Sequence, residues 1–231
     1  LDAVIHEVAT WKERLFPAGI RLLYPRADAI VVVCHATAAR FADTSGMRPD
    51  RLTVIYNPVV RPEMAERATE PIDHEWFTDG GPPVILSAGR LTPQKDHATL
   101  LRAFARVRAT RPARLVILGE GSERPALESL AAALGVAADV QLPGFRNNPF
   151  AYMSRARLFV LSSRWEGFGN VLVEAMACGL PVVSTDCPSG PAEILQDGAL
   201  GPLVAVGDAA ALGDAMLQTM SSPPDPGRLT R

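Results

Sequence analysis

The chain has 231 residues, of which 48% are apolar and 21% are charged, and its formal net charge is −2. A chain of this size and composition can bury the core of one large or two small α/β domains. No apolar run approaches the ~18 residues of a membrane span, and the near-neutral charge argues against a nucleic-acid-binding surface. The three cysteines, Cys34, Cys178 and Cys187, lack metal-ligand spacing. We therefore expect buried thiols in a reducing cytoplasm, without a disulfide framework or a zinc site.

The first 60 residues predict the end of one α/β unit. Residue 1 is not Met, residues 1–6 have the pattern of the tail of a strand, and the start lacks the basic and apolar regions of a signal peptide. We therefore expect an excerpt of a longer protein. The elements expected next are a buried strand at 29–33, a helix at 36–43 and a strand at 52–55 before the turn signal Asn57-Pro58.

The segment 61–83 is rich in Pro, Glu, Asp and Gly and has no periodicity, so it is the expected linker. From residue 84 to 220 strands and helices alternate, and 221–231 forms a Pro/Ser-rich tail. We expect strands at 84–88, 114–118, 140–142, 157–161, 181–184 and 203–206, and helices at 96–109, 123–134, 149–154, 170–178, 191–196 and 209–220. This alternation predicts an α/β fold: a Rossmann-like parallel sheet with helices on both faces, whose ligands bind beyond the carboxyl ends of the strands.

Two of the loops that follow strands in this region begin with a glycine. In 89–96, Arg90 and Lys95 place two cations beside a helix start, with Asp96 as the N-cap of that helix, and this arrangement suits a diphosphate. Two ordinary surface cations are the alternative. Gly119 and Gly121 begin a dinucleotide fingerprint that has no third glycine. A tight turn explains both of these glycines.

A third loop contains Gly144, Phe145 and Arg146. Gly144 lets the backbone approach a flat ligand, and Phe145 can pack near a base. A structural turn explains this segment equally well.

The fourth loop has the strongest pattern. Glu166 lies in the loop, Asn170 can cap the following helix, and Glu174 lies about one turn inside that helix. Gly167 and Gly169 leave N–H groups exposed at the helix start for a phosphate. Because the two carboxylates would repel a phosphate, we expect them to accept hydrogen bonds from sugar and ribose hydroxyls. The alternative is a glutamate paired with the helix dipole plus one ordinary surface glutamate.

The pair Glu166 and Glu174, separated by seven residues, resembles the signature of the family-four retaining glycosyltransferases. The motifs Gly89-Arg90-Leu91…Lys95 and Ile55-Tyr56-Asn57-Pro58 match the same family, and the resemblance covers nearly all of residues 1–220. It implies the GT-B architecture, in which two Rossmann-like domains face each other across a cleft. Residues 84–220 then form the C-terminal domain that binds the nucleotide-sugar donor, and residues 1–60 are the remnant of the N-terminal acceptor domain.

The resemblance also implies the role of each site residue. Arg90 and Lys95 grip the donor diphosphate, Glu166 faces the donor sugar, Glu174 binds the ribose, and His6 reaches the donor sugar from the acceptor domain. The remaining donor-binding residues are Gly144, Phe145 and Arg146 beside the base, and Phe168, Gly169, Asn170 and Val171 beside the sugar and phosphates.

These expectations predict transfer of a sugar from a nucleotide-diphosphate donor to a glycan or a lipid-linked acceptor. The expected nucleotide is UDP, and an N-acetylhexosamine is a candidate sugar. The resemblance implies retention without a cofactor or a metal, and the sequence contains no Asp-x-Asp motif. Same-face attack by the acceptor is preferred, with Glu166 as a covalent nucleophile kept as the alternative. We expect a cytoplasmic enzyme of surface-glycan synthesis that contacts the inner membrane face through its N-terminal domain, and we expect the excerpt alone to be inactive. A nucleotide-sugar epimerase and a non-catalytic nucleotide-binding fragment remain open.

Overall fold

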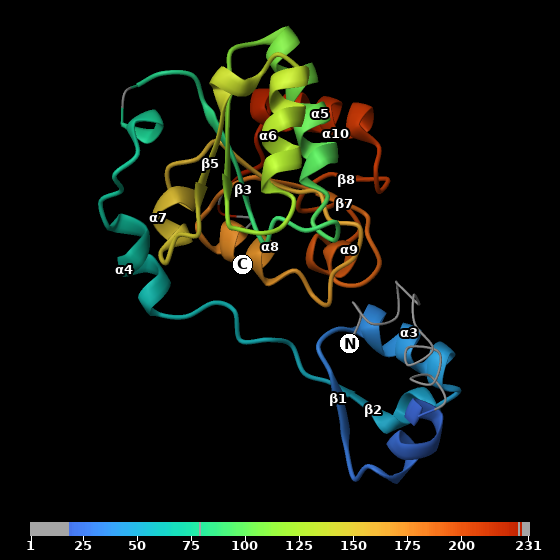
Figure 1. The fold of residues 1–231 in the computed structure, drawn as a ribbon. Coiled ribbons are helices and arrows are strands. Elements are labelled where there is room, and N and C mark those ends of the chain that lie inside the picture. Colours follow the sequence, from blue (N-terminus) through green and yellow to red (C-terminus); the bar gives the residue numbers. More distant parts are fainter. Residues whose placement is uncertain (1–18, 79, 226, 228–231) are drawn as a thin grey trace.

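The computed structural model describes residues 19–78, 80–225 and 227. Within them lie two parallel sheets, one of two strands and one of six. Figure 1 shows the small sheet and helix α3 apart from the large sheet, with one extended segment leading from β2 to α4. The strands are β1 (Ile30–Val32), β2 (Leu52–Val54), β3 (Val84–Ala88), β4 (Arg114–Leu118), β5 (Val140–Gly144), β6 (Leu158–Leu161), β7 (Val182–Thr185) and β8 (Leu203–Val204).

The helices alternate with these strands along the chain, as the sequence predicts. They are α3 (His35–Ser45), α4 (Glu63–Thr69), α5 (His97–Thr110), α6 (Arg124–Ala133), α7 (Pro149–Met153), α8 (Asn170–Ala177), α9 (Pro191–Ile194) and α10 (Ala209–Ser221). Most bounds agree with the sequence predictions to within one or two residues. No described helix is long and apolar enough to cross a bilayer.

The six-stranded sheet has the order β5-β4-β3-β6-β7-β8, and all of its neighbours run parallel. From β3 the chain proceeds outward to β4 and β5, and then returns to β6 on the other side of β3. The carboxyl ends of β3 and β6 therefore lie at a topological switch point, where α/β sheets bind their ligands. This sheet confirms the predicted α/β Rossmann-like class.

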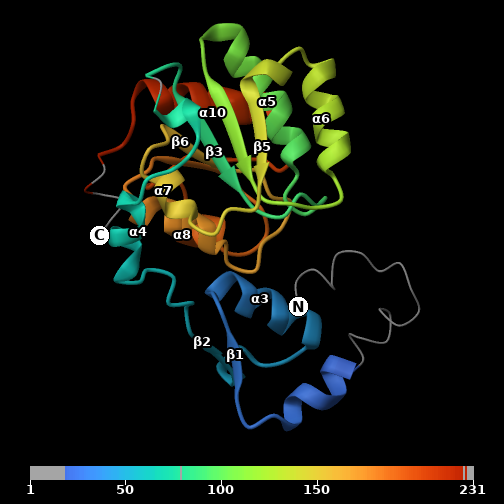
Figure 2. The same cartoon turned by 60° about the vertical axis from the view of Figure 1, so that its left-hand side comes forward.

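Helices cover both faces of the large sheet (Figure 2). Successive strand residues point to opposite faces, so Ile85 packs with α5, α6 and α10, whereas Leu86 packs with α7 and α8. Both side chains are fully buried. Burial on two faces explains why these strands are continuous apolar runs, and it makes the sheet a rigid support for the loops at its edge.

The small unit consists of β1, β2 and α3. Its strands pair in parallel from Ile30 with Leu52 to Val32 with Val54, and Phe41 of α3 packs with Ile30 in a small core. Two parallel strands and a helix fit the expected partial second Rossmann-like domain. The predicted strand tail at 1–6 lies outside the described residues.

The segment 61–83 contains more structure than the sequence predicted. Helix α4 and a 3₁₀ helix at Glu75–Phe77 interrupt it. Met64 of α4 is buried, and the Arg67 guanidinium lies 5.1 Å from the ring centroid of Phe150 on α7. The α4 part of the segment therefore packs against the large sheet domain and is not a fully exposed linker. Residues 55–61, between β2 and α4, and residues 71–74, before the 3₁₀ helix, have no regular secondary structure. The domain boundaries stay a prediction.

The N-terminus of α5 contains a buried histidine. The His97 side chain is 1% exposed, and its Nδ1 atom has no hydrogen-bond partner among the described residues. Burial, assisted by the Lys95 charge and opposed by Asp96, lowers the pKa of His97 from 6.5 to about 4. Between these two pKa values the unfolded chain binds a proton that the folded chain does not, so stability is lost as the pH falls below 6.5.

We expect His97 to lower the free energy of unfolding by about 2 kcal/mol between pH 7 and pH 5. In a His97→Gln variant this part of the decrease disappears. Urea unfolding of the wild-type and variant proteins at both pH values measures the difference. The exposed His35, changed to Gln, is the control and should leave the wild-type decrease unchanged. An equal decrease in the wild type and His97→Gln would contradict the assignment.

Candidate functional site

The loops that follow β3 and β6 meet at the switch point and are joined by hydrogen bonds. The Gln94 carbonyl accepts from Arg164 N at 2.8 Å, and Gln94 Nε2 donates to the Trp165 carbonyl at 3.0 Å. Ser162 Oγ donates to the Lys95 carbonyl at 2.8 Å. Asp96 caps α5, as predicted, by accepting from Thr99 N. The two loops therefore form one unit at the edge of the sheet.

A buried ion pair lies between these loops. Lys95 Nζ is 2.5 Å from Glu166 Oε1, and Ser163 Oγ donates to the same oxygen at 2.6 Å. The side chains of Lys95 and Glu166 are 15% and 7% exposed. Each charge offsets the desolvation of the other, so the pair fixes a cation and a carboxylate beside the helix that follows.

Helix α8 begins at Asn170, directly beyond this pair. Its N-cap is Gly169, whose φ of +95° disfavours any side chain at this position. The prediction that Asn170 caps the helix is therefore wrong: Asn170 is the first helical residue, and its Oδ1 accepts from Asn57 Nδ2 at 2.9 Å. The Leu172 N–H donates to the Gly169 carbonyl at 2.9 Å, whereas the N–H groups of Asn170 and Val171 are the ones that a helix start leaves without a partner inside the helix. The first turn carries no acidic residue. Both features favour an anion at this helix start.

A cavity of about 470 Å³, the central cavity, contains most of the predicted site. Its walls come from the β3 loop, the β6 loop, the start of α8 and two residues of the first 60. The lining residues are Val33, Asn57, Ala88, Gly89, Lys95, Glu166, Gly167, Phe168, Gly169, Asn170, Val171 and Glu174. The structure thus brings together Lys95 and six of the residues predicted between 166 and 174.

A second cavity, of about 510 Å³ and here named the Arg90 cavity, lies over the ends of β3, β4 and β5. It is lined by Arg90, Phe145 and Arg146 and shares Gly89 with the central cavity. The Arg90 side chain is exposed and forms no hydrogen bond or ion pair within the described residues. Phe145 is 71% exposed. Gly144 lies behind this wall, where its carbonyl accepts from Gly119 N at 2.9 Å. Arg90 is therefore a free cation at the mouth of the site.

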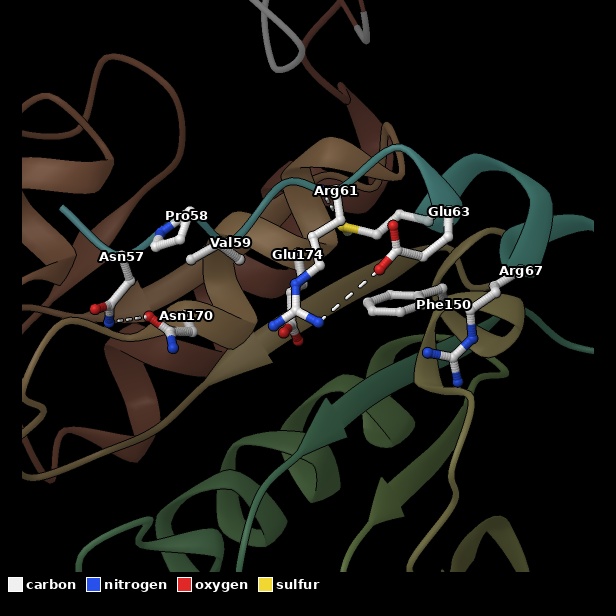
Figure 3. Close-up of a pocket in the computed structure, with 10 residues that line it drawn as sticks. Asn57, Pro58, Val59, Arg61, Glu63, Arg67, Phe150, Asn170 and Glu174 are labelled. Atoms are coloured by element: carbon white, nitrogen blue, oxygen red, sulfur yellow. Dashed lines mark hydrogen bonds and ion pairs between the residues drawn. The ribbon is translucent and has the colours of Figure 1, made fainter.

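A third cavity, of about 390 Å³ and here named the linker cavity, lies beside Glu174 (Figure 3). It shares Asn57, Asn170 and Glu174 with the central cavity, and Arg61 and Phe150 are among its other lining residues. Burial raises the pKa of Glu174, and the charge of Arg61 opposes this rise. Glu174 thus lies at the junction of two cavities, where a ligand can reach it from either side.

The remaining predictions concern His6, metal binding and the three cysteines. His6 lies outside the described residues, so its role stays a prediction. No group of three or more His, Cys, Asp or Glu side chains within the described residues could hold a metal ion. The three cysteines are free thiols, of which Cys34 and Cys187 are buried. Burial and the Glu166 charge raise the pKa of Cys187 to about 12, so it stays protonated beside the site.

Sequence reasoning missed two polar residues at the site. Ser163 shares the Glu166 carboxylate with Lys95, and Glu193 of α9 contacts the small unit. Ser163 is the second residue after β6, and this position beyond the end of a strand could have identified it. Glu193 follows a glycine and a proline at a helix start, a pattern that points only to a turn, so no local signal identified it.

The ion pair predicts a specific pattern of stability. Lys95→Met should lower the free energy of unfolding by about 3 kcal/mol, because the Glu166 carboxylate then stays buried without its cation. The double variant Lys95→Met/Glu166→Gln should recover at least half of that loss. Urea unfolding of the two single variants and the double variant measures the coupling. The matched control is Arg106→Met, which breaks an exposed pair with Asp214 and should cost under about 1 kcal/mol. Additive effects at Lys95 and Glu166 would contradict the pairing.

The sequence also matches two known protein families. The family described as "Glycosyl transferases group 1" matches residues 69–231, and "Glycosyltransferase Family 4" matches residues 3–61. The change of family falls inside the segment that joins the two sheets. The Glu166 and Glu174 motif and the Lys95 loop lie in the first match.

Several curated proteins are similar to this chain. An N-acetylgalactosamine-N,N'-diacetylbacillosaminyl-diphospho-undecaprenol 4-alpha-N-acetylgalactosaminyltransferase of Campylobacter jejuni is 37% identical over 81% of this chain and 49% of its own length. The lipopolysaccharide core biosynthesis glycosyltransferase LpsE of Rhizobium meliloti is 34% identical over 90% of this chain and 58% of its own length. The chain thus spans about half the length of the curated relatives it matches.

Solved structures agree in fold. The lipopolysaccharide outer core galactosyltransferase WaaB is 25% identical, with a TM-score of 0.71 over 90% of this chain and 58% of its own. Anabaena HepE, solved in complex with UDP and glucose, is 23% identical, with a TM-score of 0.74 over 97% of this chain and 62% of its own. The chain therefore belongs to the glycosyl transferases group 1 family and has the GT-B fold of family-four glycosyltransferases.

Proposed function

We propose that this chain is the donor-binding half of a retaining glycosyltransferase that uses a UDP-linked sugar. The observation that carries the proposal is the central cavity, where the Lys95 ammonium and the N–H groups of α8 border one space. Two positive features at the carboxyl edge of a parallel sheet suit a diphosphate. Arg90 in the adjoining cavity supplies a further cation that can turn toward it.

The proposed reaction breaks the bond between the anomeric carbon and the diphosphate oxygen. Negative charge grows on the leaving diphosphate, and Arg90, Lys95 and the start of α8 stabilise it. The acceptor hydroxyl forms its new bond on the same face of the sugar and passes its proton to the leaving phosphate oxygen. The products are a glycoside with retained configuration and a nucleoside diphosphate.

Glu166 is proposed to hold the hydroxyls of the donor sugar. One of its oxygens already accepts from Lys95 and Ser163, and a carboxylate bound in this way is a weak nucleophile. Its contacts therefore favour a hydroxyl ligand over the covalent alternative. Glu174, half-buried between two cavities, is the proposed ribose ligand, and the segment Gly144–Arg146 is the proposed wall beside the base.

The wider activity is inferred from the relatives. The Campylobacter relative is named for transfer of N-acetylgalactosamine to a diphospho-undecaprenol glycan, and LpsE for lipopolysaccharide core biosynthesis. The HepE structure contains UDP. By analogy with these proteins, we propose that this protein uses a UDP-N-acetylhexosamine donor and a glycan or lipid-linked acceptor. We place the reaction in the cytoplasm at the inner membrane face, without a metal or a cofactor.

The first test of this proposal is nucleotide binding. Arg90→Ala should weaken UDP binding roughly tenfold, because a charge-assisted contact is lost, and Arg90→Ala/Lys95→Ala should weaken it further. Titration calorimetry in the presence of EDTA measures both. The control is Arg102→Ala, which removes an exposed arginine of α5 remote from the cavities. Unchanged affinity in the double variant would refute the diphosphate site. Binding that requires added Mg²⁺ would refute metal independence.

The second test separates the two glutamates in the full-length protein. Glu166→Gln should lower kcat by roughly a hundredfold with UDP affinity little changed, because its contact strengthens as the glycosidic bond breaks. Glu174→Gln should mainly weaken UDP and donor binding. Product analysis accompanies kcat, since free UDP indicates transfer and an altered nucleotide sugar indicates an epimerase. The roles are wrong if Glu166→Gln weakens UDP binding more than Glu174→Gln does, or if it leaves kcat intact.

A further inference from the structure

A single carboxylate of the large sheet domain binds three donors from the first 60 residues. Glu193 Oε1 accepts from His35 N at 3.2 Å, and Oε2 accepts from Ala36 N at 3.1 Å. These two N–H groups begin α3, so the carboxylate also meets the positive end of an eleven-residue helix. The Tyr56 hydroxyl donates a third hydrogen bond, to Glu193 Oε1. This concentration of charge-assisted bonds ties the two parts of the chain at one point.

The same helix also binds the loop that contains Glu166. The Gly167 carbonyl accepts from Thr37 Oγ1 at 3.1 Å and from Cys34 Sγ at 3.5 Å. The rings of Tyr56 and Phe168 lie with their centroids 5.6 Å apart, at an interplanar angle of 44°. The residues that follow Glu166 are therefore held by two hydrogen bonds from Cys34 and Thr37, at the start of α3, and by one ring contact from Tyr56, just after β2.

The segment before Glu193 and the loop at Gly167–Phe168, which both contact the first 60 residues, also pack against each other. Gly190 comes just before α9, and a Cβ atom there would lie 1.8 Å from the Phe168 carbonyl oxygen. Only glycine permits the chain before Glu193 to lie this close to the Phe168 main chain. Glu166 N in turn donates to the Pro188 carbonyl at 3.3 Å. A displacement of Glu193 should therefore shift the backbone of Glu166 and the start of α8, because only a few close contacts separate them.

We propose that Glu193 and Tyr56 are positioning residues that fix the Glu166 loop relative to the small unit. Together with the Thr37 contact to Gly167 they form a clamp. This inference rests on the proposed function, in which the small unit belongs to the acceptor half. The clamp then sets the distance between the donor sugar and the acceptor. Neither Glu193 nor Tyr56 lines the central cavity, so the clamp governs transfer and not the binding of UDP.

Kinetics and binding in the full-length protein distinguish this role from a merely structural one. Glu193→Gln keeps the side-chain shape but loses the charge and one acceptor, and Tyr56→Phe keeps the ring against Phe168 but loses the hydroxyl. We expect each to lower transfer kcat, Glu193→Gln by roughly tenfold, with UDP affinity changed less than about twofold. Because both act through one contact, the double variant should be no worse than Glu193→Gln alone. The matched controls are Glu66→Gln, an exposed glutamate of α4, and Tyr24→Phe.

Amide hydrogen exchange tests the contacts of the clamp independently of activity. In Glu193→Gln, exchange should rise in peptides that cover residues 35–36 and 167–168 and stay unchanged in α5. If the wild-type protein binds no UDP and transfers no sugar, the proposed function fails, and unchanged exchange at 167–168 overturns the clamp independently. With an active wild type, the clamp is refuted by wild-type kcat in Glu193→Gln. A loss of UDP affinity as large as the loss of kcat refutes it as well.

Discussion

The ion pair between Lys95 and Glu166 is the interaction on which the arrangement of the site depends. It lies where the chain leaves β3 on one side and β6 on the other, at the switch point of the sheet. Neither charge could stay so deeply buried without the other. The pair therefore brings the two loops together and sets the start of α8 beside an ammonium. It also leaves one carboxylate in the same cavity, where the ammonium suits a diphosphate and the carboxylate suits the hydroxyls of the attached sugar.

A second constraint comes from the way the cavities divide the site. Lys95, Glu166 and the start of α8 share the central cavity, whereas Arg90 and Phe145 face the Arg90 cavity. Gly89 links the two, and Glu174 links the central cavity to the space under the linker. A ligand with a sugar, a diphosphate and a nucleoside is long enough to need such a chain of adjoining spaces. The exposed side chain of Arg90, which has no hydrogen bond or ion pair within the described residues, can then turn toward such a ligand.

Much of this architecture was predictable from sequence because the sheet is buried on both faces. Val84–Ala88 and Arg114–Leu118 are mainly apolar runs, each followed by a glycine, and their predicted bounds match the structure. Family-specific spacing located Lys95, Glu166 and Glu174, and all three line the central cavity. The prediction of the position of Asn170 failed by one residue, because Gly169 can adopt a φ of +95° and ends the loop itself.

Other features could not be predicted because they depend on contacts between distant segments. Helix α4 has seven residues and one buried apolar side chain, Met64, so no periodic pattern identifies it. Glu193 gains its role only when separate segments meet, whereas Ser163 bonds to Glu166 within the same loop. The bond between Glu193 and the start of α3 spans more than 150 residues of sequence. The partners of Glu193 are set by tertiary packing, which short-range spacing does not encode.

The most direct test of the account is a crystal structure of the full-length protein with UDP. The account predicts the diphosphate against the first-turn N–H groups of α8 and within hydrogen-bond reach of Lys95 Nζ, with Arg90 turned toward it. The ribose hydroxyls should lie on Glu174, and the Glu193 contacts to α3 should be intact. A diphosphate bound away from α8, with Lys95 still paired only to Glu166, would contradict the central claim.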